Sequence, residues 1–270
     1  MSTFTPWTAK DSAGRIAVPL ATDDKYSRGV LGIITGSTRY PGAAVLGVEA
    51  ALRTGVGMVR YLGPEAAAGL VLQRRPEAVT SEGRVQAWLI GSGMDHLERE
   101  HPSQLTDALE QPVPVILDGG ALDLCDRAAG PVVVTPHYRE LARLLDADVA
   151  EIAAEPESWA RRAADDLGVT VLLKGHSTYI AGPGICLSAA SAPTWLATAG
   201  AGDALGGILG ALVATHWMQI RDDPAELARL AATAAVLHGL AAGRASGGAP
   251  FTILDLAAEI PATIAALLRG

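Results

Sequence analysis

Short runs of apolar residues alternate with longer stretches of helical pattern over most of the chain. The apolar runs are continuous, which is typical of strands that are buried on both faces of a sheet. Strands that alternate with helices form mainly parallel sheets covered by helices. The pattern therefore predicts an α/β fold. The predicted strands are Val30–Ile34, Val56–Leu62, Val85–Ile90, Val113–Leu117, Val132–Val134 and Val169–Leu173, and the predicted helices are Gly42–Arg53, Glu65–Arg74, Ser103–Glu110, Tyr138–Leu145 and Glu157–Leu167.

The C-terminal part of the chain follows a different pattern. The segment TYIAGPGICL contains two short strand-like pieces around Pro183 and its flanking glycines, which predicts a β-hairpin. From Asp203 onward the pattern is helical, and we expect these helices to form a layer on the sheet. The predicted helices are Asp203–Met218, Pro224–Ala242 and Leu254–Leu268, the last with a kink or break at Pro261.

Composition narrows the class of protein. The chain has 270 residues, 49% of them hydrophobic, and we expect one domain over residues 1–270. Its net charge of −8 argues against a nucleic-acid partner. Cys125 and Cys186 are too few for a disulfide framework, so we expect buried, reduced thiols. The N-terminal segment lacks the apolar stretch of a signal peptide, and no apolar run is long enough to cross a bilayer, which predicts a cytoplasmic protein without a membrane partner.

The stretch TAGAGDALGG places a carboxylate, Asp203, where a glycine loop becomes a helix. Unpaired N–H groups at a helix start attract anions, and Gly200 and Gly202 allow a ligand to approach the backbone closely. A carboxylate next to a bound phosphate can remove a proton from a hydroxyl that attacks phosphorus. The same pattern also suits an Asp that simply caps the helix. Both interpretations stay open at this point.

Two further segments end predicted strands with polar residues. In LLKGHSTYIAG, Lys174 and Gly175 follow a buried strand and Thr178 opens the hairpin, and ligands bind at such strand ends in open α/β sheets. In VVVTPHYREL, His137 comes at the same edge of the sheet. A lone lysine at a strand end is often only solvated, and His137 could equally be a solvent-exposed residue at a helix start.

Glycine-rich loops follow two other predicted strands. The first spans Gly36 to Gly42 within GIITGSTRYPGAA, and the second contains Gly91, Ser92 and Gly93 within AWLIGSGMD. The first loop has neither the GxGxxG spacing of a dinucleotide fingerprint nor the Gly-Lys-Ser/Thr ending of a P-loop. Four strand-end loops therefore converge on one edge of the sheet.

The order of these motifs resembles a known family. GSTRYPGAA, AALRTGVGM, LIGSGMD, VILDGGAL, VVVTPHYREL, VLLKGHSTYIAG, TAGAGDALGGILGAL and VLHGLAA follow one another as they do in the ADP- or ATP-dependent NAD(P)H-hydrate dehydratases. The resemblance runs from about Tyr26 to Pro261 and is more specific than any single motif. It implies a ribokinase-like fold with three layers, α/β/α, a mainly parallel central sheet and a helical C-terminal layer.

The resemblance also implies a reaction and a set of residues. Members of the family repair the S-form of hydrated NADH or NADPH (NADHX or NADPHX): ADP or ATP phosphorylates the ring hydroxyl and phosphate is then eliminated, with Mg²⁺ bridging the nucleotide phosphates. Asp203 matches the catalytic aspartate and also a substrate contact, and no side chain is assigned to metal. The other matches are Ala43, Gly93 and His137 for the hydrated dinucleotide, and Lys174, Gly175, His176, Ser177, Thr178, Gly200 and Gly202 for the nucleotide.

The chain departs from the family at several positions. Asp118, Gly119 and Gly120 stand where members commonly have Asp-Ala-Asp, and SAASAPTW precedes the glycine loop in place of an Asn/Gly-rich stretch. Histidine 238 fits a family HGLA motif, but a histidine in so apolar a helix is more often a satisfied packing residue. The resemblance further implies a homo-oligomer, for which a tetramer is one possibility. It also implies a separate epimerase acting on the same substrate pool, since we find no fused epimerase domain.

Two other functions fit the same motifs. A true kinase of this superfamily would phosphorylate a small alcohol or a vitamin precursor and release a stable product. A catalytically inactive sensor of adenine nucleotides would keep the glycine loop, and the carboxylate that is absent at Gly120 motivates this alternative. A sensor, however, has no need of the base at Asp203.

Overall fold

The computed structural model describes residues 3–97, 99–100, 102–190 and 192–270 of the chain. A single nine-stranded sheet runs through the described residues in the order β1-β9-β8-β7-β6-β5-β4-β2-β3. Neighbouring strands are parallel except where β8 pairs with β7 and β9. The strands are β1 (Thr5–Pro6), β2 (Val30–Ile34), β3 (Met58–Tyr61), β4 (Ala87–Ile90), β5 (Val115–Leu117), β6 (Val132–Val134), β7 (Thr170–Leu173), β8 (Thr178–Gly182) and β9 (Ile185–Ala189).

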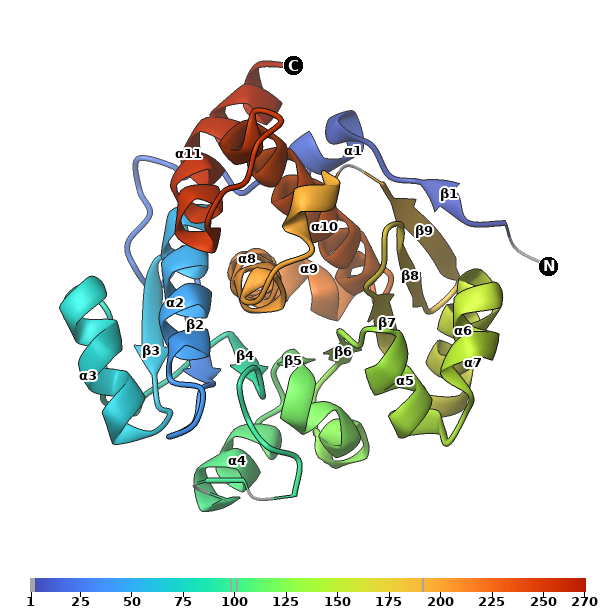
Figure 1. Ribbon diagram of the computed structural model, residues 1–270. Helices are drawn as coiled ribbons and strands as arrows, with labels where there is room; N and C mark the ends of the chain where they lie inside the picture. The colour runs from blue at the N-terminus through green and yellow to red at the C-terminus, as the bar shows by residue number, and fades with distance from the viewer. Residues whose placement is uncertain (1–2, 98, 101, 191) are drawn as a thin grey trace.

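Helices cover both faces of this sheet, which gives the predicted three layers (Figure 1). One face carries α2 (Gly42–Thr54), α8 (Ala201–Thr215), α10 (Glu226–Ser246) and α11 (Ile253–Arg269), joined by α1 (Ala9–Ala13), α3 (Glu65–Arg74) and α9 (Trp217–Asp222). The other face carries α4 (Pro102–Leu109), α5 (Tyr138–Leu145), α6 (Val149–Ala154), α7 (Pro156–Leu167) and the 3₁₀ helix η1 (Gly119–Arg127). The C-terminal helices α8, α10 and α11 therefore all pack on one face, as predicted.

Side chains of each strand alternate between the two hydrophobic cores. On β2, Leu31 and Ile33 pack with the helices around α8, whereas Val30 and Ile34 pack with those around α4. All five residues of β2 are buried, which explains why its sequence is continuously apolar. Its central residue is Gly32 because a Cβ there would lie 2.3 Å from the ring of Trp88 on β4.

Most predicted elements are confirmed, with small changes at their ends. The strand at Val30–Ile34 and the helix at Tyr138–Leu145 have the predicted bounds. The hairpin is also present, with β8 and β9 joined through Pro183 and Gly184, whose φ of 69° favours glycine. Four predicted strands start one or two residues later than expected.

Two predictions about the C-terminal helices need correction: the end of the first helix was wrong, and the break that was one alternative at Pro261 is absent. The helix predicted over Asp203–Met218 ends at Thr215, and α9 follows it. A ring nitrogen of His216 lies 2.9 Å from the carbonyl oxygen of Leu212, so a side chain contacts this carbonyl where the helix ends. Conversely, α11 continues through Pro261, which neither breaks the helix nor ends it.

Several features were not predicted. These are β1, α1, α6, η1 and a second 3₁₀ helix, η2 (Thr194–Leu196), all of them short. The two cysteines are unpaired as predicted, but they are only partly buried. In the SAASAPTW stretch, Ser191 lies outside the described residues, whereas Trp195 on η2 is half exposed.

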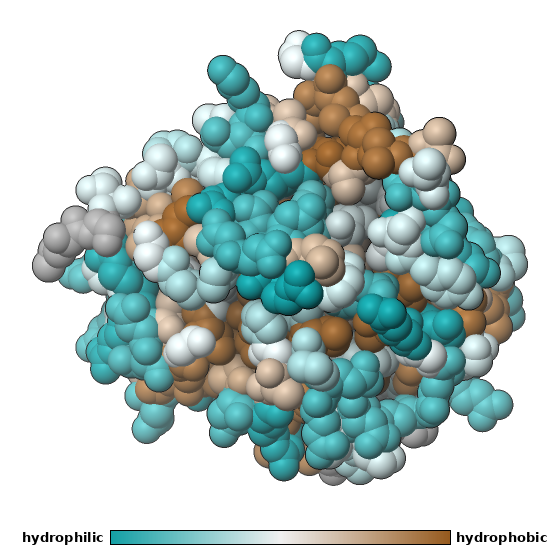
Figure 2. All heavy atoms as spheres, turned by 180° about the vertical axis from the view of Figure 1, so that it is seen from behind, coloured by the Kyte–Doolittle hydropathy of each residue, from teal (hydrophilic) through white to brown (hydrophobic). Residues whose placement is uncertain are grey.

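The surface is largely polar on the side seen in Figure 2, with an apolar patch near the top of that view, at the end of the molecule that carries α11. Exposed apolar side chains include Val18 and Leu20 after α1 and Leu268 on α11. Among the helices that the structure describes, none is both long and apolar enough to cross a bilayer.

Candidate functional site

The carboxyl ends of the parallel strands define the candidate site. The strand order reverses between β2 and β4, since β3 lies on one side of β2 and β4 on the other. Such a reversal leaves a crevice between the loops that follow the two strands. In this protein those loops contain Gly36 and Gly93, and the N–H of Gly36 donates to the carbonyl oxygen of Ser92 over 2.7 Å. The predicted substrate loops therefore meet at the switch point of the sheet.

Two predicted substrate residues are in contact there. A Cβ at Gly93 would lie 2.6 Å from the Cβ of Ala43, the second residue of α2. The φ of Gly93 is +71°, which also favours glycine. The pair thus joins the start of α2 to the loop after β4. Because Ala43 lies so close, no larger side chain fits at position 93.

Helix α8 begins at the same edge, and its first turn carries Asp203. The N-cap is Gly200, with a φ of 91° and no side-chain cap, so Asp203 is the third residue of the helix and does not cap it. Among the described residues, none donates a hydrogen bond to its carboxylate. The capping interpretation is therefore wrong. The N–H of Ala201 donates to the carbonyl oxygen of Thr198 over 3.4 Å, and the next first-turn N–H groups, those of Gly202 and Asp203, stay available to an anion.

The surroundings of Asp203 raise its pKa to about 6. Burial is the main cause, because a charged carboxylate loses contact with water. The negative charge of Asp118 adds to the increase, and the positive charge of Lys174 opposes it. A carboxylate with this pKa is ionised at pH 7 and is a stronger proton acceptor than an ordinary aspartate.

The glycines before Asp203 let the helix start approach its neighbours. A Cβ at Gly200 would lie 2.5 Å from a methyl group of Leu46 on α2. A Cβ at Gly202 would lie 3.4 Å from the amine nitrogen of Lys174. Further along, a Cβ at Gly207 would lie 2.2 Å from the carbonyl oxygen of Gly47, which explains how closely α8 packs on α2. The predicted nucleotide residues Gly200, Gly202 and Lys174 are thus brought together.

The Lys174 side chain is only 20% exposed and is paired at its strand end. Its amine donates to the Oδ1 atom of Asp118 over 2.8 Å and lies 3.7 Å from the Oε2 atom of Glu140. Although burial lowers the pKa of Lys174, the charge of Asp118 and then that of Glu140 raise it above its usual value. Lys174 is therefore a fixed ammonium group close to the start of α8.

The remaining predicted nucleotide residues form the connection between β7 and β8. Gly175 and His176 are exposed, whereas Ser177 and Thr178 are partly buried. A Cβ at Gly175 would lie 2.5 Å from the hydroxyl of Tyr138, so only glycine fits against the start of α5. This short segment follows Lys174 directly along the same edge of the sheet.

His137 caps helix α5. Its Nδ1 atom accepts a hydrogen bond of 3.2 Å from the N–H of Glu140, and the Oε2 atom of Glu140 accepts one of 2.8 Å from the N–H of His137. A backbone bridge pairs His137 with Lys174, and half of the imidazole is exposed. His137 thus lies at the predicted edge and is also the helix-start residue of the alternative interpretation.

Three residues at this edge were missed from the sequence. Ser92 and Thr135 donate to Asp118, and Glu140 contacts Lys174. The position of these three residues after a strand or at the start of a helix was the available signal. His238 is buried as predicted, and a hydrogen bond to the backbone of Ala201 contributes to its pKa, whereas its Nε2 atom has no hydrogen-bond partner among the described residues.

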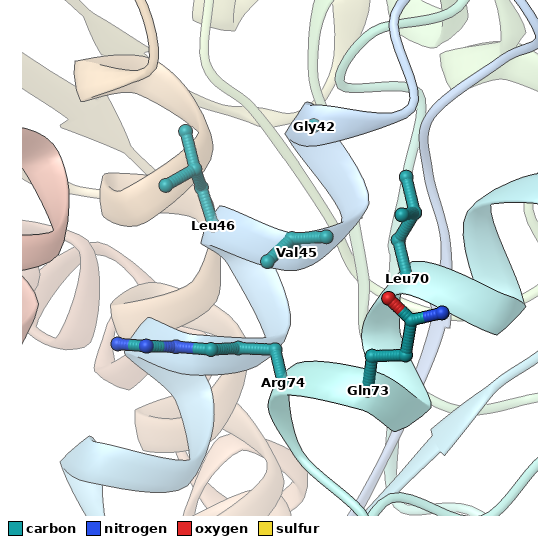
Figure 3. A pocket seen from close by; sticks show the side chains of 6 residues that line it. All are labelled: Gly42, Val45, Leu46, Leu70, Gln73 and Arg74. Atoms are coloured by element: carbon teal, nitrogen blue, oxygen red, sulfur yellow. The ribbon is translucent and has the colours of Figure 1, made fainter.

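A cavity of about 510 Å³ opens between α2 and α3, next to this site (Figure 3). Its lining includes Gly42, Leu46 and Arg74, and none of the lining residues was predicted as a site residue. Gly42 directly precedes Ala43, and Leu46 contacts Gly200, so the wall of the cavity is shared with the site. In Figure 3 the side chains of Val45 and Leu70 face each other across the cavity.

The chain is similar to proteins that act on hydrated nicotinamide cofactors. A family model described as NAD(P)H-hydrate dehydratase matches residues 31–262. A bifunctional NAD(P)H-hydrate repair enzyme of Corynebacterium glutamicum is 36% identical over 90% of this chain, which spans only 48% of that relative. An ADP-dependent (S)-NAD(P)H-hydrate dehydratase of Neisseria meningitidis is 32% identical over 70% of this chain and 71% of its own length.

A solved structure extends this similarity over the whole fold. The ADP/ATP-dependent NAD(P)H-hydrate dehydratase of Bacillus subtilis, co-crystallized with ATP and Mg²⁺, superposes with a TM-score of 0.87. It is 27% identical, and the match covers 99% of this chain and 100% of that one. The fold that the motif order implied is therefore confirmed.

Proposed function

The chain belongs to the NAD(P)H-hydrate dehydratase family, and from this premise we propose that it dehydrates the S-form of NADHX or NADPHX, driven by ADP or ATP. The observation that carries the proposal is the Asp203 carboxylate, which has a raised pKa and accepts no hydrogen bond from the described residues at the start of α8. A carboxylate that served only the fold would be capped or paired. The names of the relatives support the substrate and the nucleotide.

In the proposed first step, Asp203 takes the proton of the ring hydroxyl while that oxygen attacks the terminal phosphorus of the nucleotide. The bond between this phosphorus and the bridging oxygen breaks, so ADP leaves as AMP and ATP leaves as ADP. The first-turn N–H groups of α8, with Gly200 and Gly202, would face the phosphates. The Lys174 ammonium, 3.4 Å from where a Cβ of Gly202 would be, adds a positive charge beside them.

The second step expels the phosphate. Hydroxide is a poor leaving group near neutral pH, whereas the new phosphate ester leaves readily with its electron pair. The ring nitrogen supplies electrons as the carbon–oxygen bond breaks, and loss of a proton from the neighbouring ring carbon restores the reduced ring. We place the hydrated ring between Asp203 and the contact of Ala43 with Gly93, and His137 at the outer edge of the same site.

We propose that Mg²⁺ enters the site bound to the nucleotide. Among the residues that the structure describes, no group of three or more His, Cys, Asp or Glu side chains is arranged to hold a metal. The Asp118 carboxylate already accepts hydrogen bonds on both of its oxygens. The side chains alone therefore do not form a magnesium site, and the ion would come with the phosphates, whose charge it neutralises.

The test is to mix the protein with NADHX, Mg²⁺ and either ADP or ATP, and to follow the absorbance of the reduced nicotinamide. We expect the absorbance to recover with at least one nucleotide and not without it, and we expect Asp203→Asn to abolish most of the recovery. A stable phosphorylated product without recovery would instead indicate the kinase alternative. Nucleotide binding with neither product would indicate the sensor.

Three wider predictions complete this proposal. We propose a homo-oligomer that associates through the exposed apolar residues near α11, which light scattering after size-exclusion chromatography tests. We also propose a cytoplasmic location. A separate epimerase for the same substrate pool stays a prediction.

A further inference from the structure

Asp118, at the end of β5, is surrounded by hydrogen-bond donors from three neighbouring strand ends. Its Oδ1 atom accepts from the hydroxyl of Thr135 over 2.7 Å and from the amine of Lys174 over 2.8 Å. Its Oδ2 atom accepts from the hydroxyl of Ser92 over 2.9 Å. Only 5% of the residue is exposed. Both oxygens are therefore held in one orientation at the middle of the sheet edge.

This arrangement determines where the Lys174 ammonium lies. A lysine side chain has four rotatable bonds and would otherwise sample many positions. Here Asp118 binds the amine at 2.8 Å and Glu140 lies 3.7 Å away on another side. The amine is consequently fixed next to Gly202, the residue before Asp203. Without the Asp118 carboxylate, Glu140 would still attract the amine from 3.7 Å, but the hydrogen bond of 2.8 Å that fixes its position would be lost.

Asp118 and Lys174 together provide the charges that act on Asp203. Asp118 from β5 and Lys174 from β7 are the two charged groups that act on the Asp203 carboxylate, with opposite signs. Glu140 from α5 acts on Lys174 in turn. From α10, His238 is buried, and burial lowers its pKa to about 4, so it carries no charge at neutral pH. The pKa of Asp203 thus depends on how far the Asp118 carboxylate and the Lys174 ammonium each lie from it.

We propose that Asp118 is a positioning residue for this site: it holds the Lys174 ammonium against the start of α8, and the pair sets the pH at which Asp203 accepts a proton. The proposal rests on the proposed function for its chemical meaning. A purely structural ion pair would stabilise the fold without governing the titration of Asp203. The two cases therefore differ in a measurable quantity.

The experiment is a carboxyl-¹³C NMR titration of the intact protein labelled with ¹³C-aspartate, with Asp203→Asn used to assign the signal. In Asp118→Asn, a negative charge near Asp203 is lost, which lowers the Asp203 midpoint, and the released ammonium moves away, which raises it. Because Asp118 has the larger effect on Asp203, we expect a net fall of the midpoint, by roughly half a pH unit. The matched control is Asp123→Asn on η1, which removes an exposed carboxylate paired with Arg99 and is expected to leave the midpoint unchanged.

The reverse change supplies a second, independent arm. In Lys174→Met the neighbouring cation is gone, so the midpoint of Asp203 is expected to rise. The two shifts should also fail to add in the double variant, because Lys174 is only held in place when Asp118 is present. Additive shifts would mean that Asp118 acts on Asp203 directly and does not position the lysine, which overturns the proposal.

An unchanged Asp203 midpoint in folded Asp118→Asn overturns the proposal as well. If that variant does not fold, Lys174→Met decides alone, and a midpoint that stays or falls refutes the pair's influence. None of these measurements requires turnover. The expected shifts in a protein without dehydratase activity would leave this inference standing and remove only the proposed reaction.

Discussion

Two carboxylates of this protein lie in opposite electrostatic environments. Glu49 on α2 is fully buried and accepts hydrogen bonds from Arg53 at 2.6 Å and from both Arg74 and Arg75. Although burial raises its pKa, these hydrogen bonds lower it to about 2. Asp203 on α8 is less buried, accepts no hydrogen bond from the described residues, and has its pKa raised to about 6. Burial alone therefore does not decide what a carboxylate does; its partners decide it.

The difference separates a group that supports the fold from one that is kept for chemistry. Ionisation of Glu49 stabilises the native state, since the charged form is the one that the arginines bind. Ionisation of Asp203 destabilises it, since the charged form is favoured in water. A protein keeps such a cost where the site has a use for the group. Asp118 shares both features: it is fully paired, yet its partner Lys174 lies beside Asp203.

The largest expected effect separates the two carboxylates by activity. Asp203→Asn should lower turnover by about two to four orders of magnitude, the usual scale for loss of a general base. The affinity for ADP should stay nearly unchanged, because the nucleotide contacts are assigned to other groups. Steady-state kinetics and calorimetric titration measure the two quantities. Near-normal turnover would remove Asp203 from the role of base.

The second effect distinguishes Glu49 from Asp203 by its contribution to the free energy of unfolding. Glu49→Gln should lower the free energy of unfolding by about 3 kcal/mol, because three arginines lose their buried partner. Urea unfolding measures this change. The matched control is Glu77→Gln, where the carboxylate is half exposed and lies 3.5 Å from Arg75, and the change should stay within about 0.5 kcal/mol. Equal effects in both variants would contradict the structural role of Glu49.

The third effect decides whether Lys174 serves nucleotide binding or only supports the fold. Lys174→Ala should weaken ADP binding by about tenfold or more, the scale of a hydrogen bond to a charged group. The same variant leaves Asp118 buried without its cation, so it should also be less stable. Adding Asp118→Asn should restore stability but not affinity. An unchanged dissociation constant for ADP would place Lys174 with the fold-supporting arginines.

The fourth effect is the pH dependence of stability. Since the pKa of Asp203 rises from 3.8 to about 6, stability is lost as the pH increases through this window. Asp203→Asn should therefore raise the free energy of unfolding by about 1–3 kcal/mol at pH 8 and by much less at pH 4.

Glu49 provides the opposite sign for comparison. Its pKa falls from 4.5 to about 2, so the stability that it contributes is present above pH 4.5 and is lost as the pH decreases toward 2. Glu49→Gln should thus matter most at neutral pH and least in acid. Urea unfolding at three pH values measures both variants. The same pH trend in the two would contradict the comparison.

Much of the fold was readable from local pattern. Continuous apolar runs located the central strands, and the helix over Tyr138–Leu145 had its predicted ends, because His137 and Glu140 form a capping box that is local in sequence. The short elements were harder to predict, because contacts with the rest of the protein stabilise them and their own sequence pattern is weak. The end of α8 at Thr215 depends on the His216 side chain contacting a carbonyl group, which periodicity does not reveal.

The sequence predicted several residues of the candidate site but not the hydrogen bonds that connect them. The sequence indicated that Asp203, Lys174 and His137 share one edge of the sheet, since parallel strands end together. It did not indicate that the lysine is bound by Asp118, or that Ser92 and Thr135 complete that carboxylate's partners. These residues look like ordinary strand ends in the sequence.

By itself, the sequence determined the alternation of strands and helices, the glycine loop before Asp203 and the set of polar residues at the strand ends. These depend on side-chain size, backbone freedom and apolar periodicity, all of which act between near neighbours. Only the tertiary structure decided which charges meet, because Asp118 and Lys174 lie 56 residues apart and become neighbours through the order of strands in the sheet. Electrostatic effects depend on distance and burial in space, so the protonation behaviour of Asp203 follows from the fold and not from its motif.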